Sequence, residues 1–331
     1  MARICVTGAS GLAGRAVVAE LMGRGHWVVA TDLVAPAEDL GIPVLRADLT
    51  DYGQALEALE GADAVVHLAN IPAPEIRTPA VTFNTNMTMN FNVFMAAATL
   101  RLGRVVWASS ETTLGLPFDE PPRYAPVDED HYPVPTTTYA LSKVASETTA
   151  GHIAQWSGIP FVALRFSNIL GPDDYEEFPS YWPDPQLRKW NLWGYIDERD
   201  AAAACRLALD APADGSSSFI IAAADTVMNR PSADLMREVF PACRWPARST
   251  GPPPCCRSAA PGSYWASSRP TPGAITSTSD HGAGGVIGQV AERGPWVVSV
   301  WPRMGATVAS ELATRPRCDE CRFITRQPCP F

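Results

Sequence analysis

The chain has 331 residues, of which 26 are Lys or Arg and 35 are Asp or Glu, so its formal net charge is −9. This acidic balance disfavours nucleic acid and anionic membranes as partners, because both require a basic surface. Hydrophobic residues make up 46% of the chain, and no apolar run approaches the roughly 20 residues of a membrane span. The chain starts with Met1-Ala2-Arg3 and an apolar segment, without the layout of a signal peptide, and we expect a cytoplasmic protein.

Short β-rich apolar runs alternate with longer helical patterns over residues 1–240. This alternation predicts an α/β fold, in which helices cover both faces of a doubly wound parallel sheet. The expected strands are Arg3–Thr7, Trp27–Thr31, Pro43–Ala47, Ala64–Leu68, Arg104–Ala108, Phe161–Phe166 and Phe219–Ala222. The expected helices are Leu12–Arg24, Tyr52–Leu59, Asn84–Leu102, Tyr139–Trp156 and Arg199–Leu209. In such a fold, ligands bind at the carboxyl ends of the strands.

A glycine-rich turn joins the first strand to the first helix. Its residues are Thr7-Gly8-Ala9-Ser10-Gly11-Leu12-Ala13-Gly14. Glycines at these positions permit a tight turn, bring backbone N–H groups close to a pyrophosphate and let the helix pack against the strand. The strand before the turn and the helix after it favour a dinucleotide site over a purely structural turn.

Acidic residues end the second and third strands. Asp32 follows the glycine turn by about 20 residues, where a carboxylate can hold the ribose hydroxyls of adenosine. The same charge would repel a 2′-phosphate, so the sequence favours NAD over NADP. Asp48-Leu49 is placed to flank the adenine. For Asp32, an ordinary helix-capping role stays open as an alternative.

A tyrosine and a lysine share one face of the fourth expected helix. Tyr139 and Lys143 are four residues apart, and a nearby cation favours the phenolate, which predicts a lowered phenol pKa and proton transfer to or from a substrate hydroxyl. Ser109-Ser110 follows the fifth strand and is expected at the same crevice, with a hydroxyl for the substrate oxygen.

These motifs together resemble the extended short-chain dehydrogenase/reductase superfamily, in its NAD-dependent epimerase/dehydratase group. The residues that carry the resemblance are TGASGLAG at 7–14, Asp32, Asp48-Leu49, His67-Leu68-Ala69, NMTMNFNV at 86–93, Ser109-Ser110, the Tyr139/Lys143 pair, and Leu164–Asn168 with Gly171-Pro172. The resemblance implies a Rossmann fold with a small C-terminal substrate lobe, and a homodimer formed through helices 84–102 and 139–157.

The resemblance also implies roles for individual residues. Tyr139 is the expected catalytic acid/base, Lys143 anchors the nicotinamide ribose, and Ser110 polarises the substrate oxygen. The expected cofactor-binding residues are Gly8, Ser10, Gly11, Leu12, Gly14, Asp32, Asp48, Leu49, Leu68, Ala69, Asn86, Ser109, Tyr139 and Lys143. The expected substrate-binding residues are Ser110, Glu111, Asn168 and Arg188.

The substrate region is short. Only Asp173–Trp193 separates Gly171-Pro172 from the sheet segment at Tyr195, which predicts a small, sugar-like substrate without a nucleoside diphosphate. Arg188, five residues before Trp193, resembles an arginine of uronate dehydrogenases that grips a carboxylate, a task that suits a guanidinium. That branch continues its double serine with Asn-His, whereas Glu111-Thr112 follows here.

Alternatives remain for these substrate residues. Arg188 would otherwise be a solvated loop cation. Glu111 either binds a sugar hydroxyl or caps a helix, and Asn168 either faces the substrate or closes a turn.

We therefore expect an NAD-dependent oxidoreductase that acts on a secondary alcohol or carbonyl of a small sugar-like substrate. A nucleotide-sugar epimerase or dehydratase that retains NAD is the second candidate, since the same active-site residues serve both reactions. A non-catalytic NAD sensor is the third, although its Tyr/Lys pair would be expected to be broken. Histidines show no metal-ligand spacing, and Cys318-Asp319-Glu320-Cys321 is a lone pair of cysteines, so no metal is expected.

The composition changes near residue 241. Residues 241–331 contain no lysine, six of the eight cysteines and 13 of the 31 prolines, and show no hydrophobic periodicity. We expect an NAD-binding domain at 1–240, including part of the substrate lobe, and a disordered tail at 241–331. Family members end in Leu-Leu-Gly-aromatic-x-Pro, and the codons of Tyr264-Trp265-Ala266 encode Leu-Gly when read from their third bases. We hypothesise that this tail is frameshifted.

Overall fold

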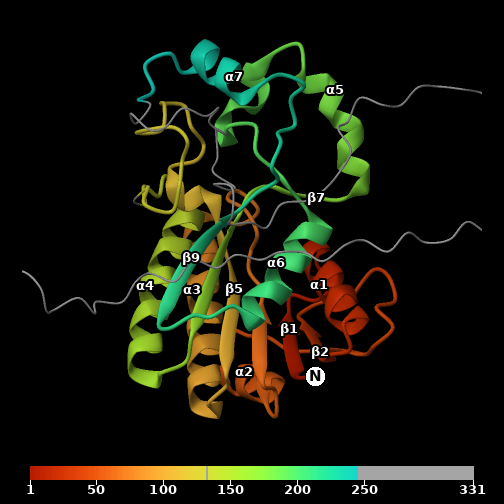
Figure 1. The fold of residues 1–331 in the computed structure, drawn as a ribbon. Coiled ribbons are helices and arrows are strands. Elements are labelled where there is room, and N and C mark those ends of the chain that lie inside the picture. The colour runs from red at the N-terminus through yellow and green to blue at the C-terminus, as the bar shows by residue number, and fades with distance from the viewer. Residues whose placement is uncertain (132, 245–331) are drawn as a thin grey trace, which may run out of the picture. The chain divides into compact units, whose positions relative to one another are not determined.

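Seven strands of the computed structural model form one parallel sheet with the order β3-β2-β1-β4-β5-β6-β9 (Figure 1). The structure describes residues 1–131 and 133–244. The strands are β1 (Arg3–Thr7), β2 (Trp27–Asp32), β3 (Val44–Arg46), β4 (Ala64–His67), β5 (Arg104–Ser110), β6 (Phe161–Phe166) and β9 (Ser216–Ile221). All seven predicted strands are confirmed, with ends that differ by at most three residues.

The central strands are buried along their whole length because both faces of the sheet are covered. All residues of β4 and β6 are buried, which explains why these segments are largely apolar without alternation; their polar members, His67 and Arg165, have buried partners. The chain proceeds outward from β1 to β2 and β3, and then returns to β4 on the other side of β1. This reversal leaves a crevice at the carboxyl ends of β1 and β4, where ligands of such folds bind.

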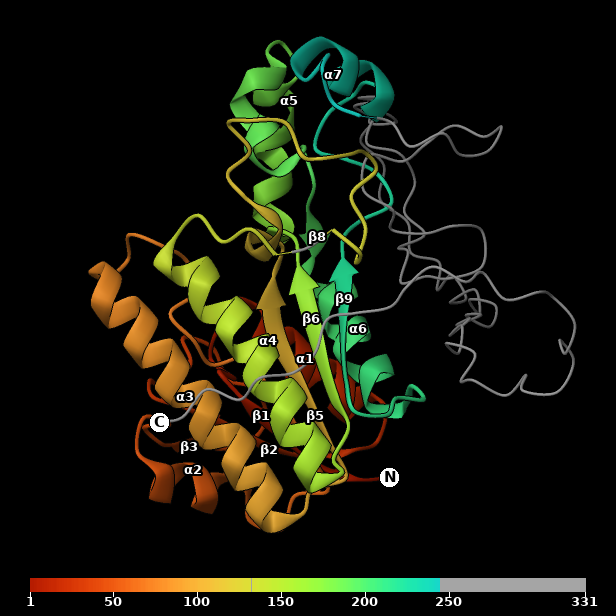
Figure 2. The same cartoon turned by 90° about the vertical axis from the view of Figure 1, so that its left-hand side faces the viewer.

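Helices cover both faces of the sheet (Figures 1 and 2). On one face, α1 (Leu12–Gly23) and α6 (Glu198–Asp210) bury Val17, Leu21 and Ala204 in one core cluster. On the other face, α2 (Tyr52–Leu59), α3 (Pro79–Leu100) and α4 (Thr138–Ser157) form the second core cluster. The predicted doubly wound α/β class is confirmed.

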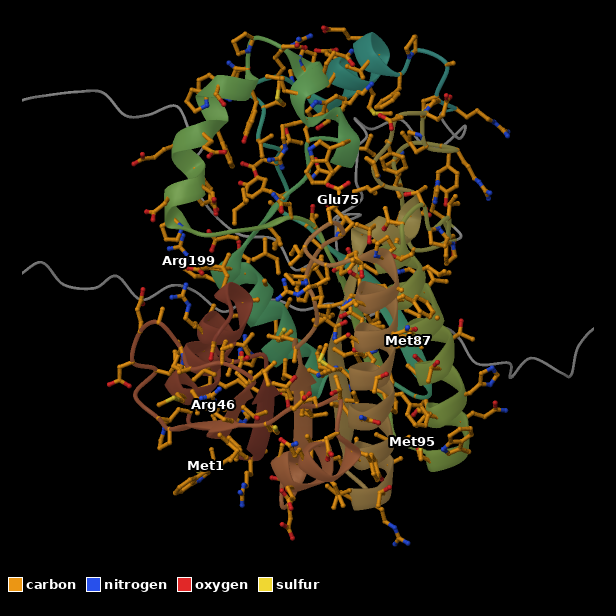
Figure 3. The ribbon with its side chains drawn as sticks, turned by 180° about the vertical axis from the view of Figure 1, so that it is seen from behind. Met1, Arg46, Glu75, Met87, Met95 and Arg199 are labelled. Carbon is orange, nitrogen blue, oxygen red and sulfur yellow. The ribbon has the colours of Figure 1, made fainter. Side chains whose placement is uncertain are left out.

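Helices α3 and α4 lie side by side (Figures 2 and 3). Met87 and Met95, labelled in Figure 3, are partly buried on α3, and the Ser146 hydroxyl of α4 lies 3.5 Å from Met87 Sδ. Helix α3 starts at Pro79, five residues before the predicted helix. Proline is tolerated at this position because N–H groups in the first turn of a helix have no partner within the helix.

A smaller lobe stands above the carboxyl ends of the strands (Figure 2). Its elements are η1 (Glu111–Leu114), β7 (Ile169–Leu170), η2 (Pro172–Glu177), α5 (Phe178–Tyr181), η3 (Pro185–Asn191), β8 (Ile196–Asp197) and α7 (Ser232–Val239), of which η1, η2 and η3 are 3₁₀ helices. The lobe has its own core cluster, with Trp193 and Leu235 fully buried. The predicted substrate lobe is thereby present, although α7 and the 3₁₀ helices were not predicted.

The described fold continues to Arg244, a few residues past the predicted boundary at 240. Ala125 N donates to Arg244 O at 2.9 Å, and Cys243 is buried in the core of the lobe. The predictions for the tail at 245–331, including its disorder and the frameshift, lie outside the described residues. Within residues 1–131 and 133–244, no helix combines the length and the apolar character that a membrane span requires.

Candidate active site

A cavity of about 980 Å³ lies at the carboxyl ends of the strands, below the smaller lobe. Its size is in the range of small-molecule and cofactor sites. Of the predicted site residues, sixteen line it: Gly8, Ser10, Gly11, Leu12, Gly14, Asp32, Asp48, Leu49, Leu68, Ala69, Ser109, Ser110, Glu111, Tyr139, Lys143 and Asn168. Asn86 and Arg188 are absent from the described lining. The cavity therefore gathers residues from the amino end of the chain to β6 around one space.

The glycine turn fits only glycine at two of its positions. Gly8 has a φ of +70°, and a Cβ there would lie 2.6 Å from Ala69 N. A Cβ at Gly14 would lie 2.0 Å from Gly8 O, so this glycine lets α1 pack directly on the turn. Gly11 caps α1 without a side-chain hydrogen bond to the helix. The first turn of α1 thus presents uncapped N–H groups and a positive dipole end toward the cavity, which suit a pyrophosphate.

Asp32 connects the end of β2 to the glycine turn. Its carboxylate accepts hydrogen bonds from Ser10 N at 2.9 Å and from Val34 N at 3.2 Å. A carboxylate offers about four lone-pair sites, so it retains acceptors for a pair of ribose hydroxyls. The Asp48 side chain also lines the cavity and accepts from Thr50 N and the Thr50 hydroxyl at 2.9 Å and 2.7 Å.

Asn86 holds the wall of the cavity without lining it. This buried side chain on α3 accepts from Ile71 N at 2.8 Å and donates to Ile71 O at 3.1 Å. It thereby fixes the segment after β4, whose Leu68 and Ala69 do line the cavity. The effect of Asn86 on a bound cofactor would pass through that segment.

Tyr139 and Ser110 lie next to each other in the lining of the cavity. Tyr139 is 7% exposed, and burial raises its pKa to about 12, although hydrogen bonding with Ser110 offsets part of this rise. The lowered phenol pKa that the Tyr/Lys spacing predicts is therefore not found in the chain alone. Burial penalises the phenolate, and the nearby Glu111 carboxylate raises the pKa further.

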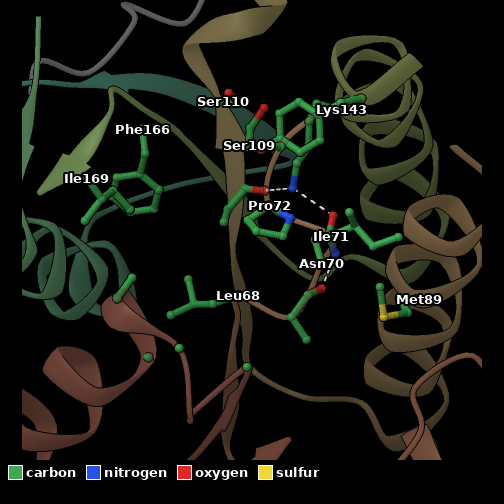
Figure 4. A pocket seen from close by; sticks show the side chains of 18 of the residues that line it. Leu68, Asn70, Ile71, Pro72, Met89, Ser109, Ser110, Lys143, Phe166 and Ile169 are labelled. Atoms are coloured by element: carbon green, nitrogen blue, oxygen red, sulfur yellow. Dashed lines mark hydrogen bonds between the residues drawn. The ribbon is translucent and has the colours of Figure 1, made fainter. Parts of the chain in front are cut away.

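Lys143 reaches from α4 to the segment after β4 (Figure 4). Its ammonium donates to Asn70 Oδ1 at 2.8 Å and to Ala108 O at 2.7 Å, and it lies 5.5 Å from the centre of the Tyr139 ring. The side chain is 2% exposed, and burial lowers its pKa to about 7. Both of these hydrogen-bond acceptors are neutral, so they orient the ammonium without a full opposing charge.

A chain of side chains fixes Asn70 in turn. Asn70 donates to Asn90 Oδ1 at 2.8 Å, and Asn90 donates to the Ser146 hydroxyl at 2.7 Å. Asn90 Oδ1 also lies 2.9 Å from His67 Nε2, whose other ring nitrogen lies 2.7 Å from the Thr7 hydroxyl. Since a carbonyl oxygen only accepts, His67 carries its proton on Nε2. Burial lowers the pKa of His67 to about 3, so this ring is neutral.

Ser109 belongs to a separate buried cluster. Its hydroxyl donates to Glu147 Oε1 at 2.6 Å, and Arg165 holds the same carboxylate with two hydrogen bonds of 2.9 Å and 2.7 Å. The Arg165 and Glu147 side chains are only 6% and 12% exposed. This ion pair joins α4 to β6, and through Ser109 it also holds the end of β5.

Glu111 occupies the end of the cavity under the smaller lobe. It is 8% exposed, and burial raises its pKa to about 7, while the neighbouring Ser167, Asn191 and Arg188 lower it. Asn191 Nδ2 lies 3.4 Å from Glu111 Oε1. Glu111 also begins η1, where Ser110 supplies the side-chain cap by accepting from Thr112 N, so Glu111 itself does not cap this helix.

Arg188 is buried in the smaller lobe, so its predicted alternative as a solvated loop cation is wrong. Its guanidinium lies between the rings of Tyr181 and Trp190, 5.1 Å and 5.2 Å from their centres. Its Nη2 lies 3.5 Å from Gly194 O. Trp190 lines the cavity and Arg188 does not, so the structure of the chain alone does not bring the guanidinium to the substrate space.

Several residues at the site were not predicted, namely Asn70, Asn90, Glu147, Arg165 and Ser167. Ser167 directly follows the buried strand β6, and Asn70 lies three residues after β4, so both are close to the pattern that identified Ser109 and Ser110. Asn90 and Arg165 lie in the segments 86–93 and 164–168 that carry the family resemblance, but no role was predicted for them, and Glu147 lies outside these segments. The partners of all three residues are distant in the sequence. Among the residues that the structure describes, no group of three or more His, Cys, Asp or Glu side chains could hold a metal ion.

Comparison with known proteins places this site in a family. The model of the NAD dependent epimerase/dehydratase family matches residues 4–222. L-arabinose 1-dehydrogenase (NAD(P)(+)) of Haloferax volcanii is 31% identical over 185 residues, which cover 54% of this chain and 71% of that protein. Uronate dehydrogenase of Pseudomonas putida is 29% identical over 206 residues, which cover 59% and 68%.

A solved structure supports the same assignment. The crystal structure of a UDP-galactose 4-epimerase has 28% sequence identity and a TM-score of 0.55, and the match covers 70% of this chain and 80% of that one. The fold and the cavity define an enzyme of the extended short-chain dehydrogenase/reductase class. The chain belongs to the NAD dependent epimerase/dehydratase family, and its cofactor is NAD.

Proposed function

We propose that the protein is an NAD-dependent dehydrogenase that oxidises a secondary alcohol of a small sugar, or reduces the corresponding carbonyl. The observation that carries this proposal is the convergence of Tyr139, Ser110 and Lys143 on one cavity that also contains the glycine turn and Asp32. The relatives named above support a sugar substrate, since two of them are sugar or uronate dehydrogenases by name.

Each residue has a separate role in the proposed reaction. NAD, when bound, would supply the hydride acceptor for the substrate carbon. Tyr139 takes the proton of the substrate hydroxyl, and Ser110 donates a hydrogen bond to the oxygen as it becomes a carbonyl. Lys143, held by Asn70 and Ala108, keeps a third N–H free for the nicotinamide ribose and favours the phenolate of Tyr139.

The cofactor-binding residues are proposed from the geometry of the same cavity. The uncapped N-terminus of α1 holds the pyrophosphate, and Asp32 holds the adenosine ribose. Asp48, Leu49, Leu68, Ala69 and Ser109 line the cavity around the dinucleotide. Asn86 acts on the cofactor through the segment that it fixes after β4.

An epimerase is the second candidate. It is favoured by the structural likeness to a UDP-galactose 4-epimerase, which has the same fold as this chain and 28% sequence identity to it. An epimerase restores its cofactor in every cycle, so it forms product isomers without net reduction of NAD. A non-catalytic sensor is disfavoured, because the Tyr139/Lys143 pair is intact and lines the cavity.

The test is the absorbance of reduced nicotinamide when the full chain is mixed with excess NAD and a panel of aldoses, uronates and nucleotide sugars. Accumulation over many turnovers supports the dehydrogenase. Product isomers without accumulated NADH would move the assignment to the epimerase. If neither NADH nor product isomers are formed, both the dehydrogenase and the epimerase are contradicted.

We also propose a cytoplasmic homodimer that forms through α3 and α4. Phe91 of α3 and Leu141 and Trp156 of α4 are large apolar side chains that are exposed in the single chain, being 47%, 45% and 66% exposed. The described cysteines Cys5, Cys205 and Cys243 are free and buried, as is common in a reducing compartment. Light scattering on the wild type and on Phe91→Glu tests the dimer, which the substitution should dissociate.

A further inference from the structure

The residues that directly follow β5 and β6 form a polar corner beside the reactive groups. Ser110 and Phe166 are register partners in the parallel pair, so Glu111 and Ser167 leave the sheet side by side. A Cβ at Gly194 would lie 3.0 Å from Ser167 Oγ and 3.9 Å from Glu111 Oε2. Both side chains therefore point to the same place, and both line the cavity together with Asn168.

This corner has unused hydrogen-bonding capacity. The Ser167 side chain is 3% exposed, and its hydroxyl makes no hydrogen bond of full geometry with any of the described residues, although it acts on the Glu111 carboxylate and lowers its pKa. The carboxylate also interacts with the backbone of Asn168 and, through a weak contact of 3.4 Å, with Asn191 Nδ2. A carboxylate offers about four lone-pair sites, so Glu111 retains acceptors for a ligand. A buried carboxylate and hydroxyl in this condition indicate that a ligand completes their hydrogen bonds.

The charges on the cavity wall restrict that ligand. Among the described lining residues, the charged side chains are Asp32, Asp48, Glu111 and Lys143. The first two lie at the ends of β2 and β3, in the proposed adenosine region, and Lys143 is engaged with Asn70 and Ala108. Glu111 is therefore the charged group closest to the space beyond Tyr139 and Ser110.

Arg188 does not reverse this balance. Its guanidinium is stacked between Tyr181 and Trp190, and it acts on the Glu111 carboxylate, whose pKa it lowers. Above pH 7, where Glu111 is ionised, a substrate carboxylate or phosphate would meet this negative charge and would have to compete with it for Arg188. An uncharged polyol meets no such penalty, because a carboxylate accepts hydrogen bonds from two adjacent hydroxyls.

We propose that Glu111, Ser167 and Asn168 form a subsite for two neighbouring hydroxyl groups of an uncharged sugar, which makes the protein selective for neutral aldoses over uronates, sugar phosphates and nucleotide sugars. This inference rests on the proposed function and names its substrate class. It also replaces Arg188 by Glu111 as the residue that sets specificity. Trp190 lines the same cavity.

The test is calorimetric binding of sugars to the NADH-bound full chain, so that it does not depend on turnover. D-glucose, D-galactose and D-mannose are each compared with their uronate and 6-phosphate, and L-arabinose is added. At least one neutral sugar should bind at least tenfold more tightly than its charged counterparts. Glu111→Gln should weaken that binding at least tenfold and reduce the preference for the neutral sugar.

Two further variants make the result specific. Glu176→Gln is the matched control, because Glu176 is exposed in the same lobe and lies outside the cavity lining, and its binding should equal that of the wild type. Ser167→Ala should also weaken the binding of the neutral sugar. It replaces Glu111→Gln as the test variant if Glu111→Gln does not fold. Thermal unfolding and NADH affinity establish that each variant is intact.

Three outcomes would overturn the subsite: equal or tighter binding of a uronate or phosphate by the wild type, no binding of any neutral sugar, or unchanged neutral-sugar binding in both Glu111→Gln and Ser167→Ala. These outcomes differ from a failure of the proposed function. A protein that binds neutral sugars through Glu111 but never forms NADH contradicts the dehydrogenase and supports the subsite. A protein that oxidises uronates in preference to neutral sugars supports the dehydrogenase and contradicts the subsite.

Discussion

Asn70 Oδ1 accepts a hydrogen bond of 2.8 Å from the ammonium of Lys143, although the two residues are 73 positions apart in the sequence. The side-chain amide of Asn70 is held by a hydrogen bond to Asn90. Asn90 is held in turn by hydrogen bonds with His67 and Ser146. The position of the ammonium beside Tyr139 therefore depends on a buried network that spans β4, α3 and α4.

Asn70→Ala should lower kcat/KM for the oxidation reaction by about tenfold, because a hydrogen bond to a charged group is lost and the buried Lys143 is less well oriented. Asn70→Asp should raise the pKa of Lys143 by placing a carboxylate beside it. Steady-state kinetics as a function of pH measure both effects. A pH profile of kcat/KM unchanged in both variants would show that Asn70 does not position Lys143.

The glycine turn predicts different effects at two neighbouring glycines. Gly14→Ala should destabilise the fold by about 3 kcal/mol, because the new Cβ would lie 2.0 Å from Gly8 O. At Gly11 a Cβ would meet Gly8 O at 3.4 Å, so Gly11→Ala should retain the fold and lose NAD affinity instead. Thermal unfolding and NADH titration separate the two effects, and equal stability of the two variants would contradict this explanation of the turn.

Asp32→Asn should reduce the preference for NAD over NADP by about tenfold, or about 1.4 kcal/mol, because it removes the charge that opposes a 2′-phosphate. The amide is close to isosteric and keeps an oxygen that can accept from Ser10 N, where the carboxylate accepts at 2.9 Å. The ratio of kcat/KM for the two cofactors is the measurement. An unchanged ratio would remove Asp32 from cofactor selection.

Glu111 should make the protein less stable as pH rises. Its pKa is about 7 in the folded chain, against 4.5 for an unperturbed glutamate, so the folded protein binds the additional proton between these values. The free energy of unfolding attributable to this group therefore falls from about pH 4.5 to pH 7. Above pH 7 the penalty of the buried charge is complete, and Glu111→Gln should be more stable than the wild type by about 3 kcal/mol.

Denaturant unfolding at pH 5 and pH 8 tests this prediction. The groups that face Glu111 are Arg188 of η3, Asn191 of the same helix, Ser167 after β6 and Tyr139 of α4. Glu176→Gln should show no comparable pH-dependent gain, because Glu176 is exposed. A gain in Glu111→Gln that is the same at both pH values would indicate that burial does not raise the pKa of Glu111.

Local patterns were sufficient for the framework of the fold. The bounds of β1, α2 and β6 agree with their predicted ranges, because their apolar periodicity is a property of adjacent residues. The glycine turn and Asp32 were predicted because the motif is contained within one strand, one turn and one helix. The eight residues of α7 were missed although α2 has the same length, because α2 follows Asp51, whose side chain caps the helix, whereas α7 follows Pro231 and has no side-chain cap.

Burial and long-range contacts account for most of what could not be predicted. The spacing of Tyr139 and Lys143 indicated a cation beside a phenol, but not that both side chains are enclosed, which raises the pKa of the phenol and lowers that of the ammonium. The sequence related Arg188 to Trp193, five residues further on, without showing that its guanidinium lies against the rings of Tyr181 and Trp190. Asn70 and Asn90 acquire their roles only when β4, α3 and α4 come together.

The most direct test of the proposed dehydrogenase is the rate of NADH formation by the wild type and Tyr139→Phe with excess NAD and neutral aldoses. Tyr52→Phe is the matched control, because the exposed Tyr52 hydroxyl contacts only Thr99 among the described residues. We predict sustained NADH formation in the wild type and the control, and a loss of about 10²-fold to 10⁴-fold in Tyr139→Phe. Equal rates in Tyr139→Phe and the wild type would contradict the proposed role of this phenol and with it the mechanism.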